Sequence, residues 1–136
     1  MKLFAITASL ILGLALQSCS KDDSDSKSKE EKLTSGIWYF ESYISDNINV
    51  SIEPCSFDNS LEFFTEGEWE SDEGVEICPN STQTSGGQWE FPNGNDMIEI
   101  TQNGFTIPAE IIQLTETKFS LKTLDGITVK YTHQKD

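Results

Sequence analysis

The chain of 136 residues has no arginine, one histidine and three cysteines. Nine lysines stand against 23 acidic residues, so the formal net charge is −14 at pH 7. A chain this acidic is repelled by phosphate backbones and anionic headgroups, which excludes nucleic acid as a partner. Because His133 is the only histidine, any Ser-His or Cys-His catalytic arrangement would have to use it.

Other catalytic and metal-binding signatures are also missing. The sequence contains no H-E-x-x-H motif, no phosphate-binding glycine loop and no Cys/His cluster with metal-ligand spacing. Two carboxylates could cleave a glycoside, but nothing selects a pair among 23 acids. We therefore predict a protein that is not an enzyme and that uses no cofactor and no metal.

The longest apolar run covers residues 3–16 and follows Lys2. About fourteen helical residues reach roughly 21 Å, which is shorter than the ~30 Å hydrocarbon core of a bilayer. One positive charge, a short apolar core and small residues before a cleavage point are the parts of a secretory signal peptide. The run ends in Leu16-Gln17-Ser18-Cys19 and resembles a bacterial lipoprotein signal, although position 17 usually holds a smaller residue. The resemblance implies that residues 1–18 are removed and that Cys19 carries lipid.

A polar segment follows Cys19. Residues 20–32 read SKDDSDSKSKEEK and contain no apolar side chain, so we expect residues 19–32 to form a lipidated, disordered acidic tether. Residues 20–23 also resemble the export signal of Bacteroidota surface lipoproteins, though a plain linker looks similar. We predict attachment to the outer membrane through the lipid and display at the cell surface, with the periplasmic face as the alternative.

From residue 33 onward, short alternating runs are separated by turn residues. Ile127, Val129 and Tyr131 alternate with polar residues, a period of two that is typical of a strand. Dipeptides such as Asn103-Gly104 are strong hairpin signals. The pattern predicts one all-β domain over residues 33–136, with about eight antiparallel strands in an up-and-down meander.

Such a meander either closes into a barrel or splits into a sandwich. We favour the barrel because closure removes exposed strand edges. A barrel of eight strands is just wide enough to be filled by side chains or to hold one small ligand.

Several short motifs occur in a specific order. Gly36-Ile37-Trp38 opens the domain, residues 61–69 read L-E-F-F-T-E-G-E-W between two cysteines, and Gly87-Gln88-Trp89 follows. Over residues 33–133 this order resembles the lipocalin-like domains of Bacteroidota lipoproteins. The resemblance implies a lipocalin-like β-barrel, in a family with little assigned biochemistry.

With Cys19 lipidated, Cys55 and Cys78 remain. The exported compartment is oxidising, so we predict a structural disulfide between them rather than two free thiols. A redox role would favour close spacing such as C-x-x-C, which is absent.

Aromatic and acidic residues offer two further candidate sites. The resemblance to lipocalins, in which the tryptophan of the first Gly-x-Trp closes one end of the barrel, implies the same structural role for Trp38. Trp69 lies between two glutamates near a turn and is predicted to be the most exposed tryptophan, able to stack on a sugar ring, with a place inside the barrel as the alternative. The acids of residues 66–76 suggest calcium, but no EF-hand loop occurs and we favour a solvated acidic face.

Our leading hypothesis is a non-enzymatic domain that binds a small, partly apolar molecule in the barrel mouth, which is an analogy at the level of fold. The alternative is a filled barrel that presents loops or Trp69 to a partner protein or glycan in a surface complex. Candidate pocket residues come from rows expected to face inward: Phe105, Ile107, Phe119, Leu121, Val129 and Tyr131.

Overall fold

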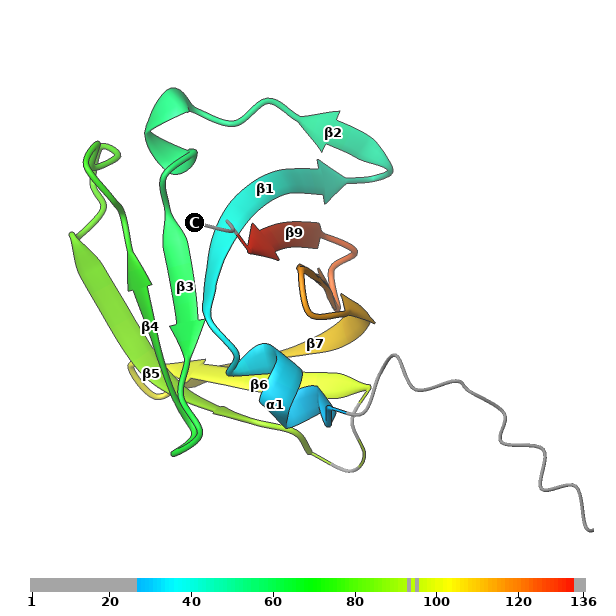
Figure 1. The fold of residues 1–136 in the computed structure, drawn as a ribbon. Coiled ribbons are helices and arrows are strands. Elements are labelled where there is room, and N and C mark those ends of the chain that lie inside the picture. Colours follow the sequence, from blue (N-terminus) through cyan, green and yellow to red (C-terminus); the bar gives the residue numbers. More distant parts are fainter. Residues whose placement is uncertain (1–26, 93, 95, 134–136) are drawn as a thin grey trace, which may run out of the picture.

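The computed structural model describes residues 27–92, 94 and 96–133 (Figure 1). The predicted signal peptide, Cys19 and the tether up to residue 26 lie outside these residues. No helix in the described part is long and apolar enough to cross a bilayer. The elements are α1 (Lys29–Leu33), β1 (Ile37–Ser45), β2 (Ile48–Val50), η1 (Pro54–Ser56), β3 (Ser60–Phe63), β4 (Glu68–Asp72), β5 (Thr84–Glu90), β6 (Met97–Gln102), β7 (Phe105–Leu114), β8 (Lys118–Thr123) and β9 (Thr128–His133).

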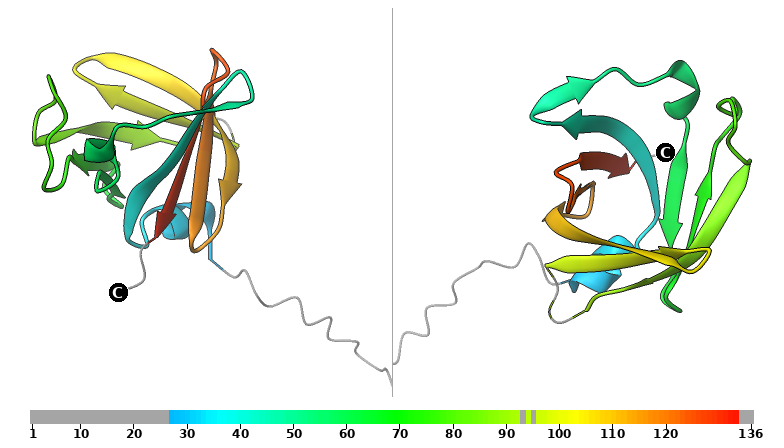
Figure 2. Two further views of the ribbon diagram at one scale, coloured as in Figure 1. Left: turned by 90° about the horizontal axis from the view of Figure 1, so that it is seen from above. Right: turned by 180° about the vertical axis from the view of Figure 1, so that it is seen from behind.

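Eight strands close into an antiparallel barrel. From β3 to β9 each strand pairs with the next, and β1 pairs with both β3 and β9. Two further views show the sheet curling around one interior (Figure 2). The predicted all-β, up-and-down barrel is confirmed, and its shape is consistent with a lipocalin-like barrel.

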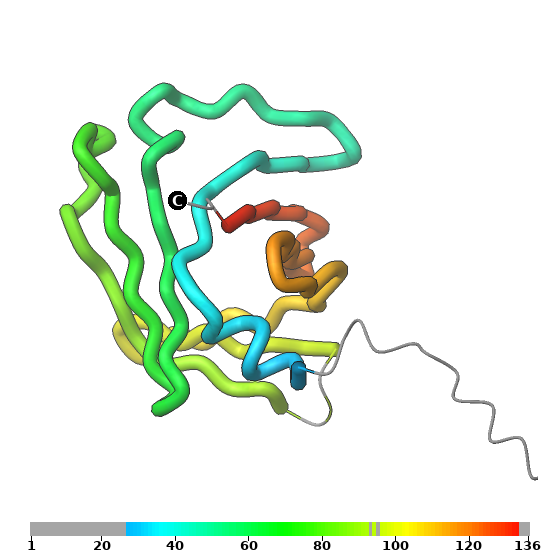
Figure 3. The backbone as a smooth tube through the Cα atoms, viewed as in Figure 1, coloured from blue at the N-terminus to red at the C-terminus, as the bar shows by residue number. Residues whose placement is uncertain are grey.

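Strand β2 is the strand that the sequence pattern did not predict. It pairs with the far end of β1 through a turn at Asp46 and Asn47, whose φ angles are 52° and 63°. Asp and Asn tolerate this left-handed conformation better than other non-glycine residues. The chain then runs through η1 to the start of β3 (Figure 3).

The core is an aromatic cluster around Phe119. Its ring lies 5.4 Å from that of Trp38, 5.8 Å from that of Phe63 and 5.7 Å from that of Tyr131, measured between centroids. Each of the three tryptophans is buried and donates its indole N–H to a backbone carbonyl: Trp38 to Leu33 at 2.8 Å, Trp69 to Thr101 at 3.3 Å and Trp89 to Phe64 at 3.0 Å. Their polar edges are thereby satisfied inside the barrel.

Helix α1 corrects the predicted end of the tether. Residues 29–32, expected to be disordered, are helical because Ser28 and Glu31 form a capping box. The Glu31 backbone N–H donates to Ser28 Oγ at 3.1 Å, and the Ser28 backbone N–H donates to Glu31 Oε2 at 2.6 Å. The ordered part of the domain therefore begins before Leu33.

This helix closes one end of the barrel. Leu33 is fully buried in the core, and its backbone carbonyl accepts a hydrogen bond from the Trp38 indole. Lys29 forms an ion pair of 2.7 Å with Asp96, just before β6. We call this side, defined by α1, Leu33 and Trp38, the closed end.

His133 lies at the closed end, with its ring centroid 3.7 Å from that of Trp38. Burial lowers the pKa of His133, and a hydrogen bond to the backbone of Glu116 offsets part of this effect. Its Nε2 is buried and has no hydrogen-bond partner among the described residues.

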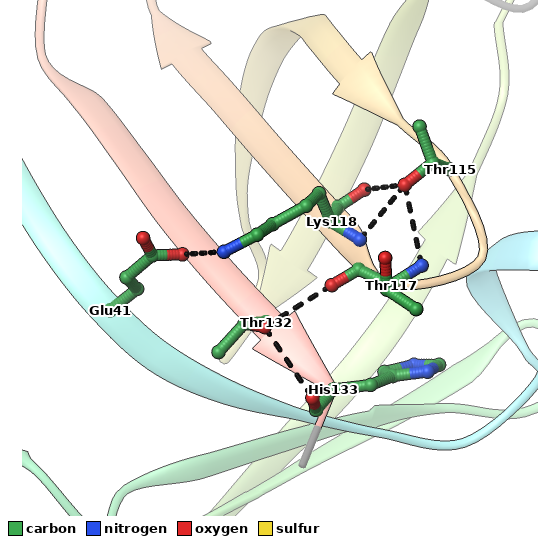
Figure 4. Close-up of polar contacts among 6 residues, drawn as sticks. All are labelled: Glu41, Thr115, Thr117, Lys118, Thr132 and His133. Atoms are coloured by element: carbon green, nitrogen blue, oxygen red, sulfur yellow. Dashed lines mark hydrogen bonds and ion pairs between the residues drawn. The ribbon is translucent and has the colours of Figure 1, made fainter. Parts of the chain in front are cut away.

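The barrel seam next to His133 is held by polar contacts (Figure 4). The backbone N–H of His133 and the hydroxyl of Thr132 both donate to the carbonyl of Thr117, each at 3.2 Å. Outside the barrel, Lys118 of β8 reaches across β9 to Glu41 of β1 at 2.9 Å. The first two contacts tie β9 to the turn before β8, and the ion pair joins the two strands on either side of β9.

Candidate functional site

A cavity of about 330 Å³ lies at the end of the barrel opposite α1. The strand directions define this end of the barrel. Strand β1 starts at the closed end, whereas β3 starts and β4 ends at the opposite end. We call this second side, where η1 and the connection from β4 to β5 lie, the open end (Figure 1). Ten residues line the cavity: Phe40, Ser56, Asn59, Ser60, Leu61, Trp69, Ser71, Glu73, Ile100 and Tyr131.

The deeper wall is apolar. Phe40 and Tyr131 are register partners on β1 and β9, and partners on antiparallel strands lie on the same face. Their rings are 6.0 Å apart in an edge-to-face arrangement. Leu61 on β3 and Ile100 on β6 complete this apolar surface. Burial raises the pKa of Tyr131 to about 12, so its hydroxyl keeps its proton at physiological pH.

Trp69 is part of this wall, which corrects its predicted exposure. Only 8% of its surface is exposed, because it pairs with Phe63 on one side and Gly87 on the other in the inward row. A Cβ atom at Gly87 would lie 3.0 Å from the Trp69 Nε1 and would collide with the carbonyl oxygen of Thr101. Glycine at position 87 therefore makes room for the indole beside the cavity.

The rim is polar, and Asn59 and Glu73 are its central pair. Asn59 Nδ2 donates to Glu73 Oε1 at 3.3 Å, and the backbone N–H of Cys78 donates to Glu73 Oε2 at 3.4 Å. The Asn59 Oδ1 atom is buried and has no partner among the described residues. Two serines of the rim are already paired, Ser56 with Cys78 Sγ at 3.4 Å and Ser71 with Ser85 Oγ at 2.7 Å.

A disulfide between Cys55 and Cys78 holds this rim together. It joins η1 to the connection that follows β4, as the sequence predicted. The two linked segments contribute Ser56 and Glu73 to the cavity. The bridge therefore fixes the relative positions of two parts of the rim that are distant in sequence.

Acidic residues also order the connection after β4. Asp58 Oδ2 accepts hydrogen bonds from the backbone N–H groups of Val75 at 2.6 Å and Glu76 at 3.4 Å. Asp72 Oδ1 accepts from the backbone N–H of Gly74 at 2.7 Å. In the described part of the chain, no group of three or more acidic, histidine or cysteine side chains is placed to hold a metal ion.

The predicted pocket residues have different positions in the structure. Tyr131 lines the cavity, whereas Phe119 and Leu121 are buried in the core beneath it. Val129 is half-buried and pairs with Leu121 on β8 and with Tyr43 on β1. The inward rows of β8 and β9 were therefore assigned correctly, but most of their side chains fill the barrel and do not line the cavity.

Phe105 and Ile107 belong to the same row of β7 as the buried Ala109, but they are not enclosed by the barrel, so their predicted place in a pocket is wrong. Their exposed fractions are 78% and 54%. Strand β8 pairs with β7 only from Ala109 onward, so residues 105–108 pair with β6 alone and extend past the barrel wall. Apolar and polar residues still alternate in residues 105–107, but no opposite wall of the barrel covers the apolar side chains.

Sequence reasoning missed most of the cavity. Phe40, Leu61 and Ile100 are in predicted strands, and their alternation could have identified them as inward-facing. Nothing in the sequence indicates that Asn59 and Glu73 meet, because a disulfide and two irregular connections bring them together.

Comparisons with known proteins add no relative. No family model matches the chain, and no curated protein matches it. Functional interpretation therefore depends on the geometry of the cavity and on the N-terminal sequence.

Proposed function

We propose that the protein is a non-enzymatic lipoprotein, anchored in the outer membrane through Cys19 and displayed at the cell surface, that binds a small, partly apolar molecule in the cavity at the open end. The cavity carries this proposal. Its volume of about 330 Å³ is at the lower end of the 300–1,000 Å³ typical of small-molecule sites. An apolar wall with a few convergent polar groups is the usual composition of such sites.

The N-terminal sequence supports the anchor, and the fold is compatible with it. The chain enters the described part at Lys27, which forms an ion pair of 2.8 Å with Glu116 in the turn between β7 and β8. Attachment therefore reaches the barrel at its closed end, where α1 lies. A membrane anchor at Cys19 would leave the cavity accessible from the other side.

Native mass spectrometry tests the binding proposal. The full chain, reconstituted in lipid nanodiscs, is exposed to a small-molecule extract of the growth medium and compared with Ser71→Phe, which places a ring in the cavity. We expect a ligand mass on the wild type that is absent from the variant. Equal adducts on both proteins, or none on either, would contradict the proposal.

Lipid incorporation tests the anchor separately. Cells fed with labelled palmitate should label the wild-type protein and should not label Cys19→Ala, whereas Cys55→Ser/Cys78→Ser should be labelled normally. Protease added to intact cells then distinguishes surface display, where the barrel is accessible, from the periplasmic face, where it is protected. Label that persists in Cys19→Ala would refute lipidation at this residue.

A second candidate function, binding of a partner protein, is favoured by an exposed apolar region. A shallow groove of about 420 Å³ lies between β7 and the hairpin of β8 and β9, and Leu124 beside it is 79% exposed. Exposed apolar residues that gather in this way are typical of interaction surfaces. Cross-linking in cells should give one partner band that is lost in Ile107→Ser/Leu124→Ser, which changes two exposed residues of the groove, and kept in Ser71→Phe. The version of this hypothesis that uses an exposed Trp69 has no support, since that side chain is buried.

A further inference from the structure

The chemistry of the rim restricts which ligands fit the cavity, an inference that depends on the proposed binding function. Glu73 is the only charged side chain among the ten lining residues. Both of its carboxylate oxygens accept hydrogen bonds, from Asn59 Nδ2 and from the backbone N–H of Cys78. Both donors are neutral, and no lysine in the described part of the chain forms an ion pair with this carboxylate.

Asn59 adds an unpaired acceptor. Its amide nitrogen must face Glu73, because a carboxylate can only accept, and this fixes Oδ1 on the opposite side of the amide. Oδ1 is buried, and no described group donates to it. A buried acceptor left unpaired costs free energy that a donor on a ligand would recover. Asn59 lines the cavity, and the bond that holds its amide is long, at 3.3 Å, so we infer that a ligand donor meets Oδ1 by displacing this bond and rotating the amide.

The serines of the rim carry no charge and do not change this balance. The hydroxyls of Ser56 and Ser71 are engaged with Cys78 and Ser85, and that of Ser60 can donate as well as accept, so it does not distinguish a donor from an acceptor on the ligand. The cavity therefore combines an aromatic and aliphatic wall with a rim that has one negative charge and one orphan acceptor.

We propose that the cavity selects a small molecule with an aromatic or aliphatic body and a hydrogen-bond donor at one end, either an alcohol or a protonated amine, and that it rejects carboxylates of the same shape. The donor reaches Asn59 and Glu73 at the rim, and the apolar body lies against Phe40, Trp69 and Tyr131. A ligand carboxylate would meet the Glu73 charge at short range with no cation beside it.

Four probes with one apolar body test this selectivity: 3-phenylpropan-1-ol, 3-phenylpropylammonium, 3-phenylpropionate and the methyl ether of the alcohol. Each is titrated calorimetrically into the full chain in nanodiscs, with empty nanodiscs as the blank. We expect the alcohol to bind roughly tenfold tighter than its ether, which is the worth of one satisfied buried acceptor. The ammonium should bind tighter than the alcohol, and the carboxylate should bind at least roughly tenfold weaker.

Matched variants assign the effect to the two rim residues. Glu73→Gln should abolish the preference for the ammonium, whereas Glu76→Gln, which removes an exposed charge from the same connection, should keep it. Asn59→Ala should bring the alcohol and the ether to equal affinity, and Asn49→Ala on the exposed β2 should not.

Two kinds of failure remain distinguishable. If the wild type binds the carboxylate as tightly as the alcohol, or the ether as tightly as the alcohol, the selectivity is refuted while the cavity remains a binding site. If none of the four probes binds, or if Ser71→Phe binds them as the wild type does, the proposed binding function itself fails.

Discussion

Removing the Cys55–Cys78 disulfide should lower stability while leaving the barrel closed. The bridge joins residues 23 apart in sequence, and a loop of this length restricts the unfolded chain by about 3.4 kcal/mol at 25 °C in the chain-entropy model. Residual structure in the unfolded state makes this an upper value. We expect Cys55→Ser/Cys78→Ser to lose about 2 to 3.4 kcal/mol of unfolding free energy.

The barrel should survive because neither cysteine belongs to a strand. Cys55 is in η1, and Cys78 lies between β4 and β5, whose ladder runs from Glu68 paired with Gln88 to Asp72 paired with Thr84. The hydrogen bonds from backbone N–H groups to Asp58 still hold the connection after β4. The loss should therefore appear as an easier global unfolding with a retained cooperative transition.

Urea denaturation followed by tryptophan fluorescence measures this effect. The double variant should unfold at a lower midpoint and with a larger m-value, since the unfolded chain without the bridge exposes more surface. Reductant should shift the wild type to the same curve and leave the double variant unchanged. A loss below about 0.5 kcal/mol, or a variant without a cooperative transition, would refute the reasoning.

Four further variants test the closed end and the cavity wall by the same denaturation assay. Gly87→Ala should cost about 2 kcal/mol, because its new Cβ meets the carbonyl oxygen of Thr101, whereas Gly36→Ala has ordinary contacts and should cost less; equal losses would contradict this. Leu33→Ala should cost about 3 kcal/mol, since the side chain is fully buried, and a loss below about 1 kcal/mol would mean that α1 does not cover the core. Because burial lowers the pKa of His133, the folded state disfavours the protonated ring, so stability is highest at pH values above its ordinary pKa of 6.5 and falls as the pH drops through the folded-state pKa. The wild type should therefore lose more stability than His133→Gln between about pH 7.5 and pH 5, and identical pH profiles would exclude this role.

The fold was predictable because two local signals agree along the chain. Alternation of apolar and polar residues located eight strands, and the Asn103-Gly104 turn has the left-handed φ angles of 50° and 80° that its sequence favours. Strand β2 has only three residues, all exposed, so its alternation of Ile48, Asn49 and Val50 is too short to identify a strand.

Trp69 shows where an available signal was given too little weight. Its two flanking glutamates are exposed, so the alternation in β4 itself places the indole inside. Proximity to a turn suggested exposure instead. Helix α1 is a similar case, because the serine and glutamate of its capping box are present in a segment that otherwise reads as a polar tether.

Phe105 and Ile107 could not be placed from periodicity alone. Alternation shows which residues share a face of a strand, but it does not show how far the neighbouring strand extends. Here β8 ends at Thr123, opposite Ala109, so the same row is buried at one end of β7 and exposed at the other. Length differences between neighbouring strands are a property of the whole sheet.

The two ends of the barrel have separate stabilising devices. At the closed end, α1 is fixed by Leu33 and by ion pairs from Lys27 and Lys29. At the open end, the disulfide and Asp58 hold the connections around the cavity, so the rim does not depend on packing against the helix. Strain transmitted through the N-terminal segment would therefore act on the closed end first. An anchor at Cys19 that pulls on α1 would leave the geometry of Asn59 and Glu73 intact, which is the property that a tethered binding site requires.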